Sequence, residues 1–292
     1  MKKIIITIPA YNEEETLGSV LEDIKKTMSA AKYHYTQLVV DDGSADNTAN
    51  IAKKAGATVV SHKRNMGLAE TFKTEMSACL KMGADIIVHT DADGQYPSHY
   101  IPEMIKKIEQ GNDLVLGSRF GKGNYSGSFA KKWGNRAFAR AISKITKVKF
   151  TDTTTGFRAF TKEVAELPLI NSFTYTQEQL IRAAKAGMNI AEIPIDTKKT
   201  RESRLFSSPF NYAFKAWLNI FRIQRDFNPL KFFGAIGGIF ILLGILLGTY
   251  IVASVLVTGF AGGTPRVVLS MLLIVTGFQI LLFGFLADMV KK

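Results

Sequence analysis

Ile86-Ile87-Val88-His89-Thr90-Asp91-Ala92-Asp93-Gly94-Gln95 is the stretch that decides the fold of this chain. Its apolar start predicts a strand, so two carboxylates and an amide would lie at the strand's end. Oxygen ligands of this kind suit Mg²⁺ or Mn²⁺, and a cation held there could bind a diphosphate. By itself, two acidic residues after a strand are also typical of a plain turn followed by a helix cap.

A calcium loop of the helix-loop-helix type is the nearest alternative for this stretch. Such a loop requires Gly at its sixth position and Glu at its twelfth. Counted from Asp91, these positions hold Tyr96 and Pro102, so the sequence excludes it.

Apolar, β-branched runs alternate with amphipathic stretches before and after this segment. The predicted strands are 4–8, 38–40, 58–60, 85–89 and 114–116, and the predicted helices are 16–28, 47–55, 68–82 and 97–109. This alternation predicts a parallel α/β sheet, which binds ligands beyond the carboxyl ends of its strands. Polar clusters follow three strands, at 9–13, 41–44 and 91–95, and we expect them to meet at one edge.

Two motifs are missing from the sequence. No Gly-rich dinucleotide fingerprint follows the first predicted strand, and no GxxxxGK[ST] occurs, so hydride transfer and P-loop hydrolysis lose their main support. The single cysteine, Cys79, excludes an intramolecular disulfide and fits a reducing compartment.

Long uncharged runs mark the C-terminal part. The mean hydropathy of the 292 residues is +0.08, and no charged residue occurs in 232–265 or in 267–287. About 20 apolar residues span a bilayer, so we predict two transmembrane helices joined by a Gly-rich loop around 259–265. A buried helical hairpin is the alternative. The predicted domains are 1–204, a juxtamembrane amphipathic helix over 205–230, and an anchor over 231–292.

Basic residues flank the predicted spans on one side only. Arg222, Arg225 and Lys231 precede the first span and Lys291 and Lys292 follow the second, whereas the loop between them carries only Arg266. By the positive-inside tendency, the N-terminal domain faces the cytoplasm of a two-span membrane protein. The net charge of +12 then favours lipid and phosphorylated substrates over nucleic acid as partners.

Six short motifs in order resemble the family 2 glycosyltransferases of the GT-A fold, specifically the polyprenyl (dolichyl) phosphate sugar synthases. They are Ile8-Pro9-Ala10-Tyr11-Asn12-Glu13-Glu14, Val40-Asp41-Asp42-Gly43-Ser44-Ala45-Asp46-Asn47-Thr48, Arg64-Asn65-Met66-Gly67, Asp91 to Gln95, Gly117-Ser118-Arg119-Phe120 and Thr155-Gly156-Phe157-Arg158. Together they cover nearly the whole predicted soluble domain.

The resemblance implies a nucleotide-sugar donor and a set of site residues. Base, ribose and diphosphate would be held by Pro9, Tyr11, Glu13, Val39, Asp41, Asp91, Ala92, Asp93 and Gln95, with Asp93 and Gln95 as ligands of Mg²⁺ or Mn²⁺. It also implies that Asp91, Asp93 and Arg119 are catalytic. Similar proteins carry an R-x-x-G-x-S-K pattern, where this chain has Lys198-Lys199-Thr200-Arg201-Glu202-Ser203-Arg204. The charges are kept, so Lys198 and Arg204 are expected at the donor diphosphate.

A phosphate monoester is the acceptor that the cationic residues favour. Its second pKa near 6 makes it largely anionic at neutral pH, so it has less need of a general base than a sugar hydroxyl. The residues expected at this phosphate are Arg119, Lys132, Arg136, Arg158 and Arg201, with Arg140 nearby. Two amphipathic helices, over 131–149 and 209–226, are predicted to lie at the bilayer surface.

The sequence therefore predicts a metal-dependent, inverting transfer of a sugar from a nucleotide diphosphate to polyprenyl phosphate, by a possible homo-oligomer. One alternative is a membrane transferase acting on a polysaccharide or a glycerolipid, for which Glu178 is a candidate base. Another is an inactive scaffold that binds nucleotide sugar or lipid. Glu178 could equally be an ordinary carboxylate at a helix N-terminus.

Overall fold

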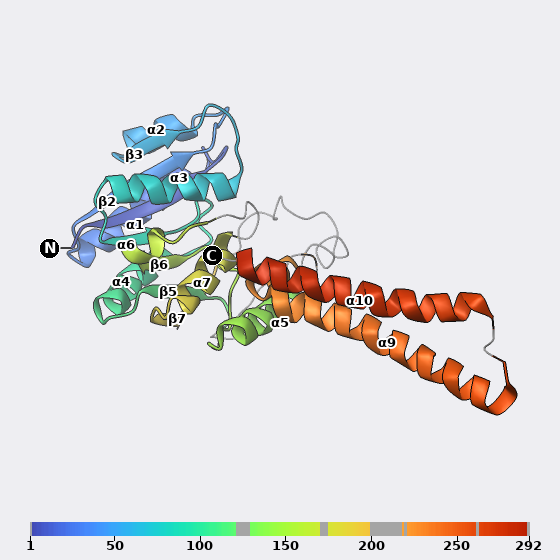
Figure 1. Cartoon of the computed structure of the whole chain (residues 1–292). Helices are drawn as coiled ribbons and strands as arrows, with labels where there is room; N and C mark the ends of the chain where they lie inside the picture. Colours follow the sequence, from blue (N-terminus) through green and yellow to red (C-terminus); the bar gives the residue numbers. More distant parts are fainter. Residues whose placement is uncertain are drawn as a thin grey trace. The chain divides into compact units, whose positions relative to one another are not determined.

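The computed structural model describes residues 2–120, 129–169, 175–198, 218, 221–260 and 263–290 (Figure 1). Within the stretch 129–138, it describes the side chain of Arg136 alone. The chain divides into two compact units, Met1–Ala213 and Phe214–Lys292.

The first unit contains strands and helices in alternation. The strands are β1 (Ile4–Ala10), β2 (Tyr35–Asp41), β3 (Thr58–Ser61), β4 (Ile86–His89), β5 (Leu114–Ser118), β6 (Arg158–Thr161) and β7 (Ile190–Pro194). The helices are α1 (Leu17–Ala30), α2 (Thr48–Lys54), α3 (Leu68–Lys81), η1 (Ser98–Tyr100), α4 (Ile101–Glu109), α5 (Phe129–Thr146), α6 (Lys162–Ala165) and α7 (Tyr175–Lys185). Each element expected up to residue 116 is present.

The strands form one sheet in the order β3-β2-β1-β4-β6-β5-β7. The expectation of a parallel sheet is wrong for β6, which pairs antiparallel with both β4 and β5. The reason is where the chain enters β6. The Ser118 hydroxyl at the carboxyl end of β5 lies 2.6 Å from the Thr151 hydroxyl, so the segment before β6 already lies at that edge of the sheet. From there, β6 can only cross the sheet in the direction opposite to β5 and β4.

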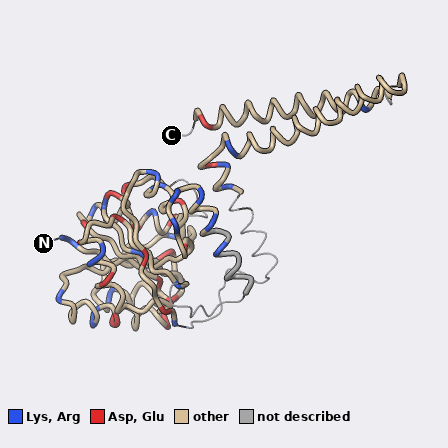
Figure 2. Tube along the Cα trace, turned by 90° about the horizontal axis from the view of Figure 1, so that it is seen from below, with Lys and Arg blue, Asp and Glu red and all other residues tan. Residues whose placement is uncertain are grey.

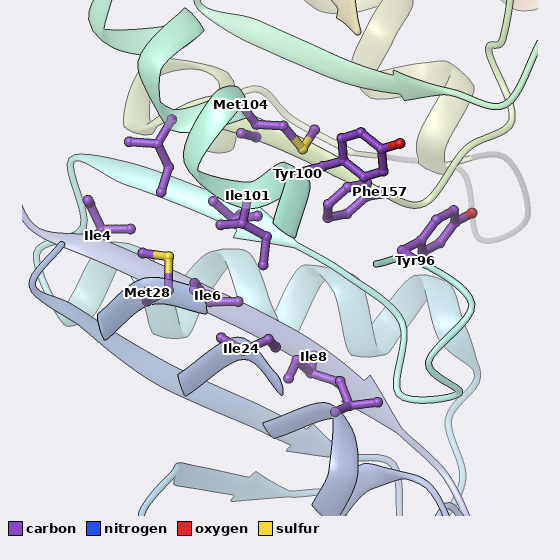
Figure 3. Packing of buried hydrophobic residues seen from close by; sticks show 14 of the residues in the cluster. Ile4, Ile6, Ile8, Ile24, Met28, Tyr96, Tyr100, Ile101, Met104 and Phe157 are labelled. Atoms are coloured by element: carbon purple, nitrogen blue, oxygen red, sulfur yellow. The ribbon is translucent and has the colours of Figure 1, made fainter. Parts of the chain in front are cut away.

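An apolar layer separates the sheet from helices α1 and α4. Alternate residues of β1, Ile4, Ile6 and Ile8, are buried in it together with Ile24 of α1 and Met104 of α4 (Figure 3). Burying one such side chain contributes about 1.5–3 kcal/mol. At the end of this layer that lies near the polar strand ends, the Tyr96 and Phe157 rings stack with centroids 5.2 Å apart.

The other face of the sheet is covered by α3. Phe72 of this helix is fully buried, and its ring meets His89 edge-on at 5.0 Å and Tyr175 of α7 at 4.5 Å. One turn further along α3, the buried Glu75 accepts a hydrogen bond from the Thr7 hydroxyl at 2.8 Å and lies 3.2 Å from His89 Nδ1. Side chains of β4 are thus packed against helices on both faces of the sheet.

The second unit is a helical hairpin of α9 (Pro229–Thr258) and α10 (Thr264–Val290), which run side by side (Figure 1). Both helices are long and apolar enough to cross a membrane, and Figure 2 shows them almost without charged residues. The expected pair of apolar helices is confirmed. Residues 221–227, from the predicted juxtamembrane helix, are helical; most of the rest of that helix lies outside the described residues.

Glycines allow α9 and α10 to pack closely. A Cβ on Gly277 would lie 2.7 Å from the carbonyl oxygen of Gly237, and a Cβ on Gly244 would lie 3.0 Å from that of Ser270. The Ser270 hydroxyl donates a 2.9 Å hydrogen bond to the Gly244 carbonyl. Small residues that bring two backbones together are typical of helix pairs in membranes.

Candidate functional site

Three strand ends meet at one cavity, as the sequence predicts. The cavity has a volume of about 320 Å³ and is lined by Pro9, Ala10, Tyr11, Glu13, Asp42, Asn65, Gly67, Leu68, Thr71, Asp91, Ala92 and Asp93. They come from the end of β1 and the loop after it, from the loops after β2 and β4, and from the start of α3 with the loop before it. The strands are parallel neighbours, so their carboxyl ends open on the same side.

Hydrogen bonds join the loops after β1 and β2. The backbone N–H of Asn12 donates to the Ser44 hydroxyl at 2.9 Å, and the Asn12 carbonyl side-chain oxygen accepts from the Ala45 N–H at 2.9 Å. The N–H of Glu13 donates to the Thr48 hydroxyl at 2.8 Å. These bonds hold the residues that follow Tyr11 in place. The Tyr11 side chain lines the cavity and is 41% exposed, so its ring could stack on a base.

Asp42 holds a further loop against the cavity. One of its carboxylate oxygens accepts from the Met66 N–H at 2.8 Å and lies 2.7 Å from His62 Nδ1, while the other accepts from the Gly67 N–H at 2.9 Å. Gly43 has a positive φ of 72°, and a Cβ there would lie 2.5 Å from the Arg64 backbone. Sequence reasoning placed Asp41 in the site and missed Asp42, although both belong to one motif.

The turn after β4 presents two carboxylates. An oxygen of Asp93 accepts from the Gln95 N–H at 2.9 Å, and Gly94 between them adopts a φ of 71°. The pKa of Asp91 is raised to about 6, chiefly by burial. The charge of Asp93 also raises this pKa, whereas His89 and Arg119 lower it. Burial is thus the main reason why the charged form of Asp91 is disfavoured in the protein alone.

These residues fit a divalent cation that is shared with a ligand. Among the described residues, no group of three or more His, Cys, Asp or Glu side chains could hold a metal ion by itself. Mg²⁺ is commonly held by one or two carboxylates, with phosphate oxygens and water filling the other positions. Asp93 supplies a carboxylate of this kind, and a Cβ on Gly156 would lie 3.1 Å from Asp91 Oδ1, so the space beside Asp91 depends on glycine.

Arg119, at the end of β5, is held by Asp152. Its Nε and Nη2 donate to the two carboxylate oxygens at 2.7 and 3.0 Å, and Nη2 also donates to the Thr154 hydroxyl at 2.6 Å. Asp152 is fully buried, while the Arg119 side chain is 16% exposed. Burial raises the pKa of Asp152, but the charge and hydrogen bonds of Arg119 outweigh burial and hold that pKa below its ordinary value.

Asp152 is a residue that sequence reasoning missed. It precedes the Thr155 to Arg158 motif by three positions, and nothing in the local pattern separates it from a turn residue. Its backbone N–H and that of Thr151 donate to the Glu192 carboxylate of β7, each at about 3.1 Å. The segment that carries Asp152 is therefore anchored to the sheet.

Arg158 is placed differently from the expectation of an acceptor contact. The side chain is fully buried; its Nη1 donates to the Thr176 carbonyl and to the Gln179 side chain, each at 3.0 Å, and Nη2 donates to the Thr155 carbonyl. Burial lowers its pKa to about 10. Arg158 thus joins β6 to α7 in the interior.

The remaining predicted residues do not line this cavity or lie outside the described residues. Val39 is fully buried inside β2, and Asp41 is 4% exposed, with one oxygen accepting from the Ser44 N–H. The N–H of Lys198 donates to the Gln95 carbonyl at 3.0 Å, and the residue lines a second cavity beside α1. Arg136 is exposed on α5. Arg201, Arg204 and the side chain of Lys132 lie outside the described residues.

Glu178 is engaged within its own helix. It is 1% exposed, and its Oε1 accepts from Arg182 Nε and Nη2, one turn along α7, at 2.9 Å each. A carboxylate held in this way serves the packing of α7. The structure therefore gives little support to Glu178 as a base for a sugar hydroxyl.

Comparison with known proteins identifies the family of the chain. The model of the family described as "Glycosyl transferase family 2" matches residues 5–167. The chain is 36% identical over 194 residues, 66% of this chain and 81% of the relative, to the dolichyl-phosphate hexose transferase of Haloferax volcanii. It is 27% identical over 300 residues, 99% of this chain and 87% of the relative, to the undecaprenyl-phosphate 4-deoxy-4-formamido-L-arabinose transferase of Shewanella sediminis.

A solved structure shares the fold. Glucosyl-3-phosphoglycerate synthase from Mycobacterium tuberculosis, in complex with Mn²⁺, uridine diphosphate and glucosyl-3-phosphoglycerate, aligns with a TM-score of 0.59 at 22% identity, covering 75% of this chain and 80% of that one. The sheet is thus of the GT-A type. Since the family model spans more than half of the sequence, this chain belongs to glycosyl transferase family 2 and is a glycosyltransferase.

Proposed function

We propose that the protein transfers a sugar from a nucleotide diphosphate to polyprenyl phosphate at the cytoplasmic face of a membrane. The observation that carries this proposal is the meeting of the ends of β1, β2 and β4 at one cavity that contains Asp91 and Asp93, in a chain that also has two helices long enough to span a bilayer. The relatives named for dolichyl and undecaprenyl phosphate support a lipid phosphate as the acceptor.

The donor nucleotide would lie in the cavity. Tyr11 offers an exposed ring for the base, and Glu13 offers a carboxylate that could accept from ribose hydroxyls. Asp42 keeps the loop at 66–67 in place as one wall. The diphosphate would then reach the turn after β4.

A divalent cation bound by Asp93 and Gln95 would neutralise the charge that develops on the departing nucleoside diphosphate. A solved structure with the same fold contains Mn²⁺ and uridine diphosphate, which supports a metal of this class. Asp91, next to Asp93, would orient the diphosphate. Its raised pKa is caused chiefly by burial, and a cation bound beside it would favour the charged form.

The acceptor phosphate needs positioning more than activation. It is already anionic at neutral pH, so the chain has to hold an oxygen in line with the bond between sugar and diphosphate. Arg119, which follows β5 and which Asp152 fixes with two hydrogen bonds, would supply positive charge for this. Attack from the side opposite the leaving group would invert the anomeric centre.

The test is transfer of label from nucleotide sugar to lipid. Membranes containing the full chain are incubated with radiolabelled uridine- and guanosine-diphosphate sugars and polyprenyl phosphate, and the label that extracts into chloroform is counted. The wild type should give chelator-sensitive product, and Asp93→Ala should lower it by at least about a hundredfold, the scale of losing one main electrostatic contact.

Asp23→Asn is the matched control, because Asp23 is an exposed carboxylate on α1 and should keep full activity. Product that stays in the aqueous phase would point to a polysaccharide acceptor. If no donor gives any product, an inactive binding scaffold is favoured. Full, chelator-sensitive activity of Asp93→Ala would refute the metal assignment.

A further inference from the structure

Helix α10 has one face turned toward α9 and another turned away from it. Ser270, Gly277 and Gly284 are its buried residues and lie seven apart on the face that meets α9. Gln279 follows Gly277 by two positions, which is about 200° around a helix of 3.6 residues per turn. Its side chain is exposed and lies on the outer face.

The outer face carries a regular repeat. Its exposed residues are spaced alternately three and four apart: Leu272, Val275, Gln279, Leu282, Leu286 and Met289. An average spacing of 3.5 residues is the pattern by which one helix packs along a second one, with positions a and d facing the partner. Gln279 occupies a central a position, where a single polar residue specifies register and partner number in paired helices.

Gln279 lies deep in the predicted span. The uncharged run of α10 is flanked by Arg266 and Asp288, which are about 33 Å apart at 1.5 Å per residue, close to the thickness of the hydrocarbon layer. By the same measure Gln279 is about 13 Å from the level of Asp288, near the middle of the layer. It is the one uncharged amide side chain in the sequence between these two residues.

No hydrogen bond to the Gln279 side chain is formed by any residue that the structure describes. Other polar side chains in the hairpin bond to backbone carbonyls, as Ser270 does to Gly244 and Thr249 to Leu246. An amide without a partner in hydrocarbon is strongly unfavourable. Acyl and polyprenyl chains have no hydrogen-bonding groups, so a second polypeptide is the partner that could satisfy the Gln279 amide inside the hydrocarbon layer.

We propose that the outer face of α10 is the interface of a homodimer, in which Gln279 of one copy hydrogen-bonds to Gln279 of the other. Two copies inserted in the same orientation are parallel, and a two-fold axis along the membrane normal brings identical a positions together. The amide has both a donor and an acceptor, so the pair is complementary to itself. Leucine, valine and methionine side chains on both sides would pack around it.

The first test measures self-association of the full chain in phosphatidylcholine vesicles. Energy transfer between two populations, each labelled at the N-terminus with a different fluorophore, is followed while the ratio of protein to lipid is lowered. Gln279→Leu should weaken the dimer by about threefold to twentyfold, the range for one hydrogen bond between membrane helices. Gln279→Asn should restore most of the association, since it keeps the amide.

Phe278→Leu is the control for Gln279→Leu, because Phe278 is exposed at the same depth but lies about 100° away around the helix. Its dimer should be as strong as that of the wild type. A wild type without energy transfer, or a Gln279→Leu variant as strongly associated as the wild type, overturns the proposal.

Cross-linking tests the face independently. Leu286→Cys places a thiol at an a position, and Phe285→Cys places one at the same depth but outside the repeat; the two side chains are 57% and 49% exposed. The native Cys79 is buried and should not compete. Oxidation should give a disulfide-linked dimer with Leu286→Cys only. Equal yields from both variants, or linkage to a different polypeptide in native membranes, would contradict the homodimer.

Discussion

Replacing Asp152 with Asn should unfold the first unit more easily, because it removes the charge that holds Arg119. Asp152 accepts five hydrogen bonds: three from Arg119, through its N–H, Nε and Nη2, and two from Thr154. If the amide nitrogen takes the place of Oδ2, it faces the Arg119 N–H and Nε–H, and both of those bonds are lost.

The cost follows from the kinds of bond that are lost. A hydrogen bond to a charged group contributes about 1.5–3 kcal/mol, and both lost bonds are accepted by the Asp152 carboxylate, which gives at least about 3 kcal/mol. Removing one partner of a buried ion pair costs about 3–5 kcal/mol, and the 16% exposure of Arg119 favours the lower end. In a unit of this size, about 3 kcal/mol lowers Tm by about 6–12 °C.

Calorimetry of the full chain in detergent would measure this shift, with Asp23→Asn as a control that should leave Tm unchanged. Arg119→Gln combined with Asp152→Asn should cost much less than the sum of the single changes, since both remove one interaction. The reasoning is refuted if Asp152→Asn lowers Tm by less than about 2 °C or if the two changes are additive.

Acid should have a related effect on the same pair. Because the pKa of Asp152 is lower in the folded protein than in the unfolded chain, its stabilising contribution is complete above the unfolded value of about 4 and is lost as pH falls through the folded value. Between pH 5 and about pH 2, the wild type should lose more stability than Asp152→Asn. Parallel losses of stability in the two proteins would contradict this.

Three further predictions concern glycines and the cysteine. Gly43→Ala should destabilise the first unit by about 2 kcal/mol or more in chemical unfolding, since φ is positive and the Cβ meets the Arg64 backbone; an unchanged midpoint would contradict this. Gly277→Leu should separate the helix pair, because its side chain would overlap the Gly237 carbonyl, and cysteines placed across α9 and α10 should then cross-link less than in the wild type. Cys79 should react with thiol reagents only on unfolding, since burial raises its pKa; rapid labelling of the native chain would refute this.

Much of the fold could be predicted from local patterns. The strand ending before Asp91 and the helices on both sides of it follow from runs of a few apolar residues, whose periodicity depends only on which face is buried. The two apolar helices follow in the same way, because no charged residue interrupts runs long enough to span a bilayer. The antiparallel β6 could not be predicted, since the direction of a strand depends on the edge of the sheet at which the preceding loop ends.

The candidate site shows the same division. Asp91 and Asp93 were expected because short motifs place them at a strand end, and the structure brings them to the cavity with Pro9, Tyr11 and Glu13. The buried position of Arg158 was not foreseen. An arginine in a motif gives the type of charge available, whereas its exposure depends on what packs over it.

The sequence alone determined the order of strands and helices up to residue 116, the polar strand ends and the two apolar helices, because each is encoded by neighbouring residues. Only the tertiary structure decided that Asp152 holds Arg119, that Asp42 holds the loop at 66–67, and that Gln279 faces away from α9. These are relations between residues far apart in the chain or between one residue and a packed neighbour. They arise when the sheet and the hairpin close, since burial and hydrogen-bond geometry are properties of the packed structure.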